Sequence, residues 1–314
     1  MPASEAMIAR WTAPRHYSIV AGTILTGTDT GVIVGLFLAG ILCDNGFAGG
    51  WPSVFYVFGM VGCAWFVCWC FLCYSSPYTH PRISRVELEY FERTIGAEEL
   101  ARHPPTPWKK ILTSVPVWAL TALYFAESWL FFGLVTLLPL YMHDVLGLNM
   151  TNIGVLSSVP FLGAIITSPI TGLVVDWLRA PGRLATGVAR KVSAFAGCIL
   201  CDICLIAIWF VGCNRALAVL NFFLLLAFEG MVLNCTMSNQ LDLAPLHAGK
   251  LMGLTSALAT LGAILQPLVV GAITAQQSTR STWQNVFFVT AGVNTFGAVV
   301  FVVFGSGNRQ SWAD

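Results

Sequence analysis

Long runs of apolar residues alternate with short polar segments along most of the 314-residue chain. A transmembrane helix needs about 20 consecutive, mostly apolar residues. Eight segments meet this requirement, and the loops between them hold nearly all the formal charge, so the pattern predicts an all-α integral membrane protein. The predicted spans are residues 19–42, 53–74, 115–142, 152–177, 192–212, 216–238, 251–274 and 284–304.

The composition excludes an ordinary soluble domain. Only 10% of the residues are charged, 56% are hydrophobic, and the mean hydropathy is +0.75. A soluble domain carries roughly 25% charged residues. A globule of this composition would expose far more apolar surface than soluble monomers tolerate.

The basic residues predict which side of the membrane each loop faces. One alternating set of loops, together with both termini, holds fourteen of the 16 Lys and Arg residues, and the other set holds only Arg215 and Arg280. Cytoplasmic loops carry the excess of basic residues, so we expect both termini and the long loop at 75–112 to be cytoplasmic. The fourteen are Arg10, Arg15, Arg82, Arg85, Arg93, Arg102, Lys109, Lys110, Arg179, Arg183, Arg190, Lys191, Lys250 and Arg309.

The long polar loop suggests the domain organisation. Ser84 and Glu87 have the spacing of a capping box, and Gly96 follows as a stop, which predicts a short amphipathic helix. This helix either lies on the membrane surface or is a solvated connector. We expect residues 1–74 and 113–314 to form separate helical units joined by 75–112.

Four acidic residues fall inside the predicted spans, where each opposes membrane insertion by roughly 2.5–3.5 kcal/mol. They are Asp29, Glu127, Asp202 and Glu229. Glu127, between Tyr124 and Trp129, is the strongest candidate for a transport pathway, followed by Glu229 and Asp29. Each also has a purely structural interpretation, and Asp202 has no clear functional one. We expect no basic residue deep in any span.

Small and sulfur-containing residues in the spans suggest packing. Gly27, Gly31 and Gly35 recur at four-residue spacing, which predicts a close approach between helices. The cysteines in apolar runs are interpreted as small buried hydrophobes, without the ligand set of a metal site. These are Cys63, Cys68, Cys70, Cys73, Cys198, Cys201, Cys204 and Cys235. Soluble catalytic signatures are missing, so we expect neither an enzyme nor a nucleic-acid partner.

A loop motif gives the first family resemblance. Gly172 and Asp176 have the G-x-x-x-D spacing, and the basic residues Arg179 and Arg183 follow. This arrangement resembles the C-terminal copy of the major facilitator loop motif. The acid would pair with basic neighbours or a helix dipole in one transport state and release them in the other.

Further segments resemble the anion/cation symporter family, which includes sialin, the vesicular glutamate and nucleotide transporters and the sodium-dependent phosphate cotransporters. They are PWKKILTS at 107–114, NQLDLAP at 239–245, WQNVF at 283–287 and the end of the chain from Gly305 to Trp312. Within that family, residues 134–142 and 156–160 look most like the sialin branch. Asn239 and Asp242 belong to the motif that the family places in a loop after its tenth helix.

The resemblance implies a twelve-helix transporter of which the eight spans are helices five to twelve. We therefore expect the sequence to be incomplete at its N-terminus, where helices one to three and most of helix four would lie. Glu127 departs from the family pattern, which has Asn or Arg at this position. The membrane-embedded arginine and glutamate residues of helices one and four have no counterpart here.

The implied function is secondary active transport of a small organic or inorganic anion, coupled to H⁺ or Na⁺, with no other cofactor. A sodium-dependent phosphate cotransporter and a non-transporting membrane protein remain alternatives. We expect a lysosomal, vesicular or plasma membrane location. Asn149 begins a glycosylation sequon on the side away from the cytoplasm.

Overall fold

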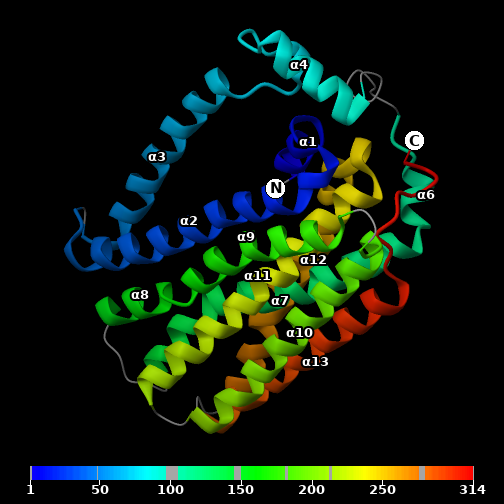
Figure 1. Ribbon diagram of the computed structural model, residues 1–314. Coiled ribbons are helices and arrows are strands. Elements are labelled where there is room, and N and C mark those ends of the chain that lie inside the picture. Colours follow the sequence, from blue (N-terminus) through cyan, green and yellow to red (C-terminus); the bar gives the residue numbers. More distant parts are fainter. Residues whose placement is uncertain are drawn as a thin grey trace.

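The computed structural model describes residues 2–47, 49–96, 105–144, 150–180, 183–211, 214–275 and 280–313 (Figure 1). Every regular element in these ranges is a helix, in agreement with the predicted all-α class. Eight segments within them are long and apolar enough to cross a membrane. They contain α2 (Tyr17–Asn45), α3 (Trp51–Leu72), α7 (Val115–Asp144), the pair α8 (Met150–Ser158) and α9 (Phe161–Leu178), α10 (Thr186–Val211), α11 (Arg215–Leu243), α12 (Ala248–Thr274) and α13 (Arg280–Phe304).

Three of the predicted spans are found with different helix boundaries. The span at 152–177 is two helices, because Pro160 lacks the backbone N–H that a continuous helix would need there. The span at 192–212 begins at Thr186 as α10, so Arg190 and Lys191 are helical. The span at 216–238 continues to Leu243 as α11.

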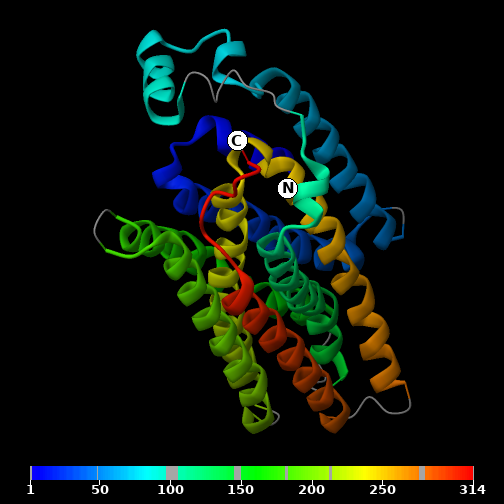
Figure 2. The same ribbon diagram turned by 90° about the vertical axis from the view of Figure 1, so that its right-hand side faces the viewer.

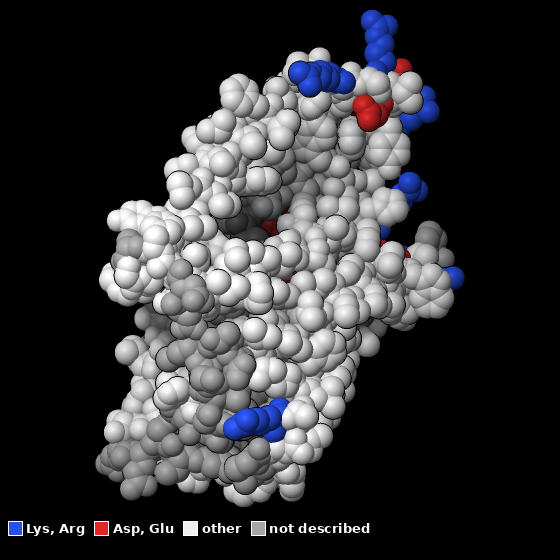
Figure 3. Space-filling model, turned by 90° about the vertical axis from the view of Figure 1, so that its left-hand side faces the viewer, with Lys and Arg blue, Asp and Glu red and all other residues white. Residues whose placement is uncertain are grey.

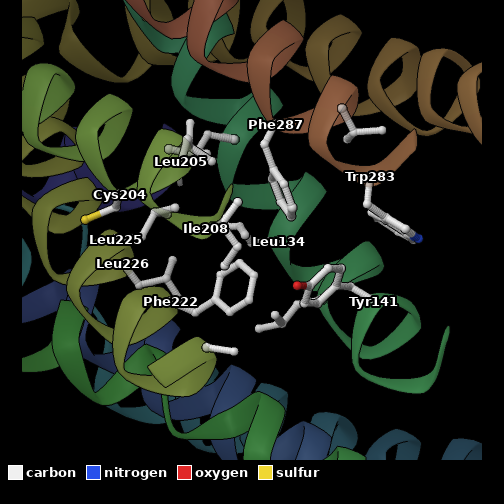
Figure 4. Close-up of a cluster of buried hydrophobic side chains, with 14 of the residues drawn as sticks. Leu134, Tyr141, Cys204, Leu205, Ile208, Phe222, Leu225, Leu226, Trp283 and Phe287 are labelled. Carbon is white, nitrogen blue, oxygen red and sulfur yellow. The ribbon is translucent and has the colours of Figure 1, made fainter. Parts of the chain in front are cut away.

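The helices from α7 to α13 pack into one bundle around an aromatic core (Figures 1 and 4). The ring of Tyr141 meets the rings of Phe222, Trp283 and Phe287 edge-on, with centroids 5.7, 5.6 and 5.7 Å away. Edge-to-face contacts are a favoured arrangement of aromatic pairs. Since lipid is as apolar as these side chains, such close packing holds the bundle together in a membrane.

The N-terminal helices lie against one side of this bundle. α2 runs along α8 and α9, while α3 packs mainly against α2 and stands away from the bundle (Figures 1 and 2). The short helix α1 (Pro2–Trp11) rests on the start of α12. A Cβ atom at Gly249 would come within 2.7 Å of the Pro2 carbonyl oxygen, so glycine permits this contact.

Within the part of the chain that the structure describes, the glycine ladder has no helix packed against it, contrary to the sequence-based prediction. A Cβ atom at Gly27, Gly31 or Gly35 would meet nothing within 4 Å. The close approach of α2 to α9 instead uses two other glycines. Added Cβ atoms at Gly22 and Gly172 would lie 2.7 Å from the Ser168 oxygen and 2.5 Å from the Ser18 oxygen, respectively.

The cysteines fall into two groups, of which only one fits the prediction of burial. Those on α10 and α11 are buried, and the Cys201 thiol donates to the Leu225 carbonyl oxygen at 3.6 Å. Cys63, Cys68 and Cys70 are exposed instead, because α3 has few neighbours to cover them.

The connector contains the predicted capping box. In α4 (Arg85–Phe91), the Glu87 backbone N–H donates to the Ser84 hydroxyl oxygen at 3.2 Å, and the Ser84 N–H donates to Glu87 Oε2 at 3.1 Å. A π-helical turn, Glu92–Gly96, follows and ends at Gly96, whose φ of 102° suits a residue without Cβ. The α4 helix lies across the end of the molecule that carries both termini (Figure 1).

The segment after α13 packs against the same end of the bundle. The Gln310 N–H donates to the Leu243 carbonyl oxygen, and the Asn239 amide donates to that of Ser306, both at 3.0 Å. Trp312 and Ala313 are buried. A second short helix, α6 (Trp108–Leu112), leads into α7 nearby.

Candidate functional site: buried carboxyl groups and a charge network

Two of the intramembrane acids form a pair inside the bundle. Glu127 comes from the middle of α7 and Glu229 from the middle of α11, and their residues are only 4% and 1% exposed. Their carboxyl groups are close enough to interact strongly with each other. The two residues lie 102 positions apart in the chain, so the fold alone brings them together.

The chemistry of this pair requires a proton. Ionised carboxylates only accept hydrogen bonds. Oε2 of Glu127 and both carboxyl oxygens of Glu229 are buried and accept nothing from the donors in the described part of the chain. A hydrogen bond between the two groups therefore needs one of them to be a carboxylic acid. Burying two ionised carboxylates side by side would leave both without compensation.

A third acid faces the pair from the N-terminal helices. Asp29 lies on α2, is 2% exposed, and interacts electrostatically with both glutamates. Tyr124, one turn before Glu127, is within electrostatic reach of Glu127 and also of Glu5 on α1. The N-terminal helices thus contribute Asp29 and Glu5 to this group of acids, and the bundle contributes Glu127 and Glu229.

Glu5 was missed by the sequence analysis. Its residue is 1% exposed, and its Oε2 atom has no hydrogen-bond partner among the described residues. The α1 segment is too short and too polar to register as a span, so an acid within it carried no sign of burial. The α1 helix is packed mainly against α12, and also touches α2, α11 and the turn at 245–247.

Trp129 lies apart from these acids. It lines a small cavity together with Gly133, Gln266 and the aromatic core around Trp283, where there is room for about one water. The indole N–H of Trp129 and Oε1 of Gln266 are buried without a described partner, so they could hold that water. Trp129 therefore lines a cavity whose described lining residues do not include the acids.

Asp202 has a structural role that the sequence did not reveal. Its two carboxylate oxygens accept from the Asn294 amide at 2.8 Å and from the Thr295 hydroxyl at 2.7 Å. The same amide also donates to the Cys198 carbonyl oxygen at 3.1 Å. Both oxygens of this buried acid are satisfied, and the contacts link α10 to α13.

Three of the predicted conformational-switch residues, Asp176, Arg179 and Asp242, form a charge network with Arg190 at the end of the bundle that also carries the termini. Arg179 donates to Asp242 at 2.9 Å and lies 3.5 Å from Asp176, while Arg190 donates to the other oxygen of Asp242 at 2.8 Å. The network connects α9, α10 and α11. Asp242 is bound by two guanidinium groups, the charge-assisted geometry that gives the stronger protein hydrogen bonds.

Asp176 also connects the network to α2. Its Oδ2 atom accepts from the Ile19 backbone N–H at 3.0 Å, in the first turn of α2. Nearby, the Asn234 amide of α11 donates to the carbonyl oxygens of Ser18 and Ser168, at 2.9 and 3.2 Å. Asn234 thus ties together three helices, a role that no sequence motif indicated.

Two motif residues lie where the sequence did not place them. Asn239 and Asp242 belong to the last two turns of α11 rather than to a loop, because the helix continues to Leu243. Arg183 takes no part in the ion pairs of the network. Its guanidinium lies 3.8 Å from the centre of the Trp177 ring and donates to the Trp177 carbonyl oxygen.

Arg190 lies near the start of α10, whereas the sequence analysis placed it in a loop. The side chain is fully buried in α10, and its two terminal nitrogens have no hydrogen-bond partner among the described residues. Its charge is compensated by Asp242 at the helix end.

On the face shown in Figure 3, Lys and Arg side chains gather mainly at the end that carries α4, and acidic atoms lie at the floor of a hollow.

Comparison with known proteins identifies the fold. Residues 1–246 match the family described as Major Facilitator Superfamily. The chain belongs to this superfamily. Major facilitator proteins transport solutes by rocking two helical halves about a site between them. The motif from Gly172 to Arg179 is at the contact of α2 with α9, where this chain's N-terminal helices meet its bundle.

Proteins similar to this major facilitator chain agree with the anion/cation symporter resemblance. Human sialin is 35% identical over 99% of this chain and 62% of its own length. The vesicular glutamate transporter 3 of Danio rerio is 36% identical over 100% of this chain and 53% of its own length. A putative inorganic phosphate cotransporter of Drosophila ananassae is 33% identical over 99% of this chain and 65% of its own length. The chain therefore spans between about half and two thirds of these relatives.

The remaining predicted site residue, Asn149, lies outside the described residues. Of the expected pathway residues, the structure brings together Glu127, Glu229 and Asp29, with Tyr124 beside them. Their function stays a prediction, and so does the division of the chain at 75–112.

Proposed function

We propose that this protein takes part in secondary active transport of a small organic or inorganic anion, driven by protons. The observation that carries the coupling is the buried pair of Glu127 and Glu229, which needs one bound proton. Superfamily membership supports a carrier that alternates between two states. Relatives named for glutamate and phosphate support an anionic solute.

In this proposal the Glu127–Glu229 pair is the proton carrier. Opening the contact between α2 and the bundle would admit water, which stabilises the ionised form of the acids and releases the proton. Closing it would favour uptake of a proton from the other side. Asp29 enters from α2, so its negative charge would be felt by the pair only while that contact is closed.

The charge network would stabilise one of the two conformations between which the carrier alternates. Asp176 joins α9 to α2, and Arg179 joins α9 to α11 through Asp242. Breaking these contacts would free α2 to move at this end of the bundle. We place this end in the cytoplasm because most basic residues lie in loops on that side. A proton-driven carrier fits an acidic lysosomal or vesicular membrane as well as the plasma membrane.

The shared proton is tested by infrared spectroscopy of the purified chain in nanodiscs. We expect a C=O stretching band of a buried carboxylic acid at neutral pH, lost in both Glu127→Gln and Glu229→Gln. Asp202→Asn is the matched control, since both oxygens of Asp202 are already satisfied. A band that survives both glutamate substitutions would contradict the proton-sharing pair.

Transport is tested by uptake into proteoliposomes under an imposed proton or sodium gradient. Labelled acidic sugar, glutamate and inorganic phosphate serve as substrates. Proton-driven uptake abolished by Glu127→Gln supports the proposal. Sodium-driven phosphate uptake would favour the second candidate, a sodium-dependent phosphate cotransporter, which the Drosophila relative suggests. No uptake under either gradient would favour the non-transporting alternative.

A further inference from the structure

An apolar groove on the outside of the bundle is lined by α7, α12 and α13 (Figure 2). Its volume is about 590 Å³, which falls within the usual range of ligand sites. Both α12 and α13 pack closely against α7 but contact each other much less, so the space between them stays unfilled. Trp118, Leu261 and Phe296 in its walls are 48%, 49% and 67% exposed, so the groove opens outward.

The described walls of the groove offer no free polar group. The indole N–H of Trp118 donates to the Leu112 carbonyl oxygen at 2.7 Å, and the Thr121 hydroxyl donates to that of Val117 at 2.8 Å. The other described lining side chains are apolar, and a Cβ atom at Gly292 would meet nothing within 4 Å. An apolar occupant therefore suits the groove, because it gains dispersion contacts with walls that otherwise face a gap.

The position of the groove along the helices matches one leaflet of a bilayer. On α7 the lining residues run from Trp118, in the first turn, to Phe125, which lies about 15 Å from the helix start at 1.5 Å per residue. Half of a hydrocarbon core is also about 15 Å thick. Since α7 begins at the end of the molecule that carries the termini, the groove faces the leaflet on that side (Figure 1).

Two lysines lie at the headgroup level of that leaflet. Lys109 and Lys110 on α6 are exposed, and neither pairs with an acid in the described part of the chain. Trp118 ties α6 to the groove, because its indole bonds to Leu112 at the end of α6. Basic residues beside the end of a membrane helix attract anionic lipids, and a tryptophan such as the exposed Trp108 anchors at the interface.

We propose that the groove holds an acyl chain of one anionic phospholipid, whose headgroup lies against Lys109 and Lys110. The apolar walls and the open space at Gly292 take the chain, and the two ammonium groups set the preference for a negatively charged headgroup. The bound lipid fills the gap between α12 and α13 and so fixes their spacing at this end of the bundle. This lipid site is separate from the buried carboxyl groups and does not depend on the proposed transport function.

The test measures lipid binding to the purified chain in detergent by native mass spectrometry, with phosphatidylserine or phosphatidylcholine added. We expect one phosphatidylserine to bind about tenfold or more tightly than phosphatidylcholine, because two lysines face its headgroup. Lys109→Gln and Lys110→Gln should each weaken this binding about fivefold, as for one basic residue near a lipid surface. Lys191→Gln removes the same charge on α10, outside the groove, and is the matched control.

A second pair of variants tests the groove itself. Gly292→Leu fills the groove and should abolish the tight binding of phosphatidylserine. Gly271→Leu adds the same side chain to α12 outside the groove, where a Cβ atom also meets nothing within 4 Å, and should leave the binding unchanged. Unfolding temperatures measured without added lipid show whether each variant is folded.

Three results would each overturn the proposal. The first is equal phosphatidylserine affinity in Gly292→Leu and Gly271→Leu. The second is equal affinity of the native chain for phosphatidylserine and phosphatidylcholine. The third is equal phosphatidylserine affinity in Lys109→Gln, Lys110→Gln and Lys191→Gln.

Discussion

Asp176 on α9 accepts a hydrogen bond from the backbone N–H of Ile19 on α2, with 3.0 Å between Oδ2 and nitrogen. The carboxylate thus caps the first turn of α2, at a residue 157 positions earlier in the chain. It satisfies one of the N–H groups left unpaired at a helix start and interacts favourably with the helix dipole.

Removing this cap is expected to destabilise the contact of α2 with α9. Asp176→Ala should lower the free energy of unfolding by about 1–2 kcal/mol, the usual cost of losing a cap and its dipole interaction. Hydrogen exchange of the Ile19 amide, compared with that of buried amides in α11, measures the local effect. Glu89→Gln on the exposed face of α4 is the control, and equal Ile19 protection in both variants would contradict the capping role.

The close contact at Gly172 predicts a steric effect. A Cβ atom there would lie 2.5 and 2.8 Å from the carbonyl oxygen and carbon of Ser18, and backbone atoms cannot move aside cheaply. Gly172→Ala should therefore lower the unfolding temperature in detergent. Gly271→Ala is the matched control, because its added methyl group meets nothing within 4 Å and alanine favours a helix by up to about 1 kcal/mol.

The contacts of Asp202 predict a stability role rather than a transport role. Asp202→Ala should cost about 1–3 kcal/mol, because it leaves the buried Asn294 amide and Thr295 hydroxyl with fewer acceptors. A double-mutant cycle with Asn294→Ala, followed by thermal unfolding in detergent, measures the coupling between the two residues. Strictly additive effects would show that the hydrogen bond does not stabilise the fold.

The capping box predicts a pH effect in the connector. Hydrogen bonds from the Ser84 backbone N–H and hydroxyl hold the pKa of Glu87 below its ordinary value. The folded pKa is below the unfolded one, so the stabilisation of α4 is complete above the unfolded pKa. It is lost as the pH falls through the folded pKa.

Hydrogen-exchange protection factors of residues 85–91, corrected for intrinsic rates, measure this effect. Protection should fall on acidification in the native chain and in Glu89→Gln, but change little in Glu87→Gln. The same pH response in all three proteins would show that another group controls this helix.

Periodicity and composition predicted the helices well because membrane spans require long apolar runs. The break at Pro160 was missed, since the apolar run continues through it. The early start of α10 was missed because the apolar run is interrupted there although the helix is not. Arg190 interrupts the apolar pattern, and only the ion pair with Asp242 makes its burial tolerable.

The candidate site was partly predictable. Glu127 and Glu229 stood out because a carboxyl group in lipid is costly. Their pairing depends on how α7 and α11 are rotated against each other, which no local pattern encodes. Gly27 and Gly172 illustrate the same limit. The sequence placed Gly27 in a packing ladder and Gly172 in a loop motif, but among the described residues only Gly172 has another helix against it.

Because the native cysteines differ in exposure, the rates at which their thiols are labelled can report movement of the helices. Three thiols on α3 face outward, whereas Cys198, Cys201, Cys204 and Cys235 are enclosed by the bundle. A membrane-permeant thiol reagent should therefore label α3 rapidly and the bundle slowly. The slow phase would report how often α10 and α11 separate, without any introduced label.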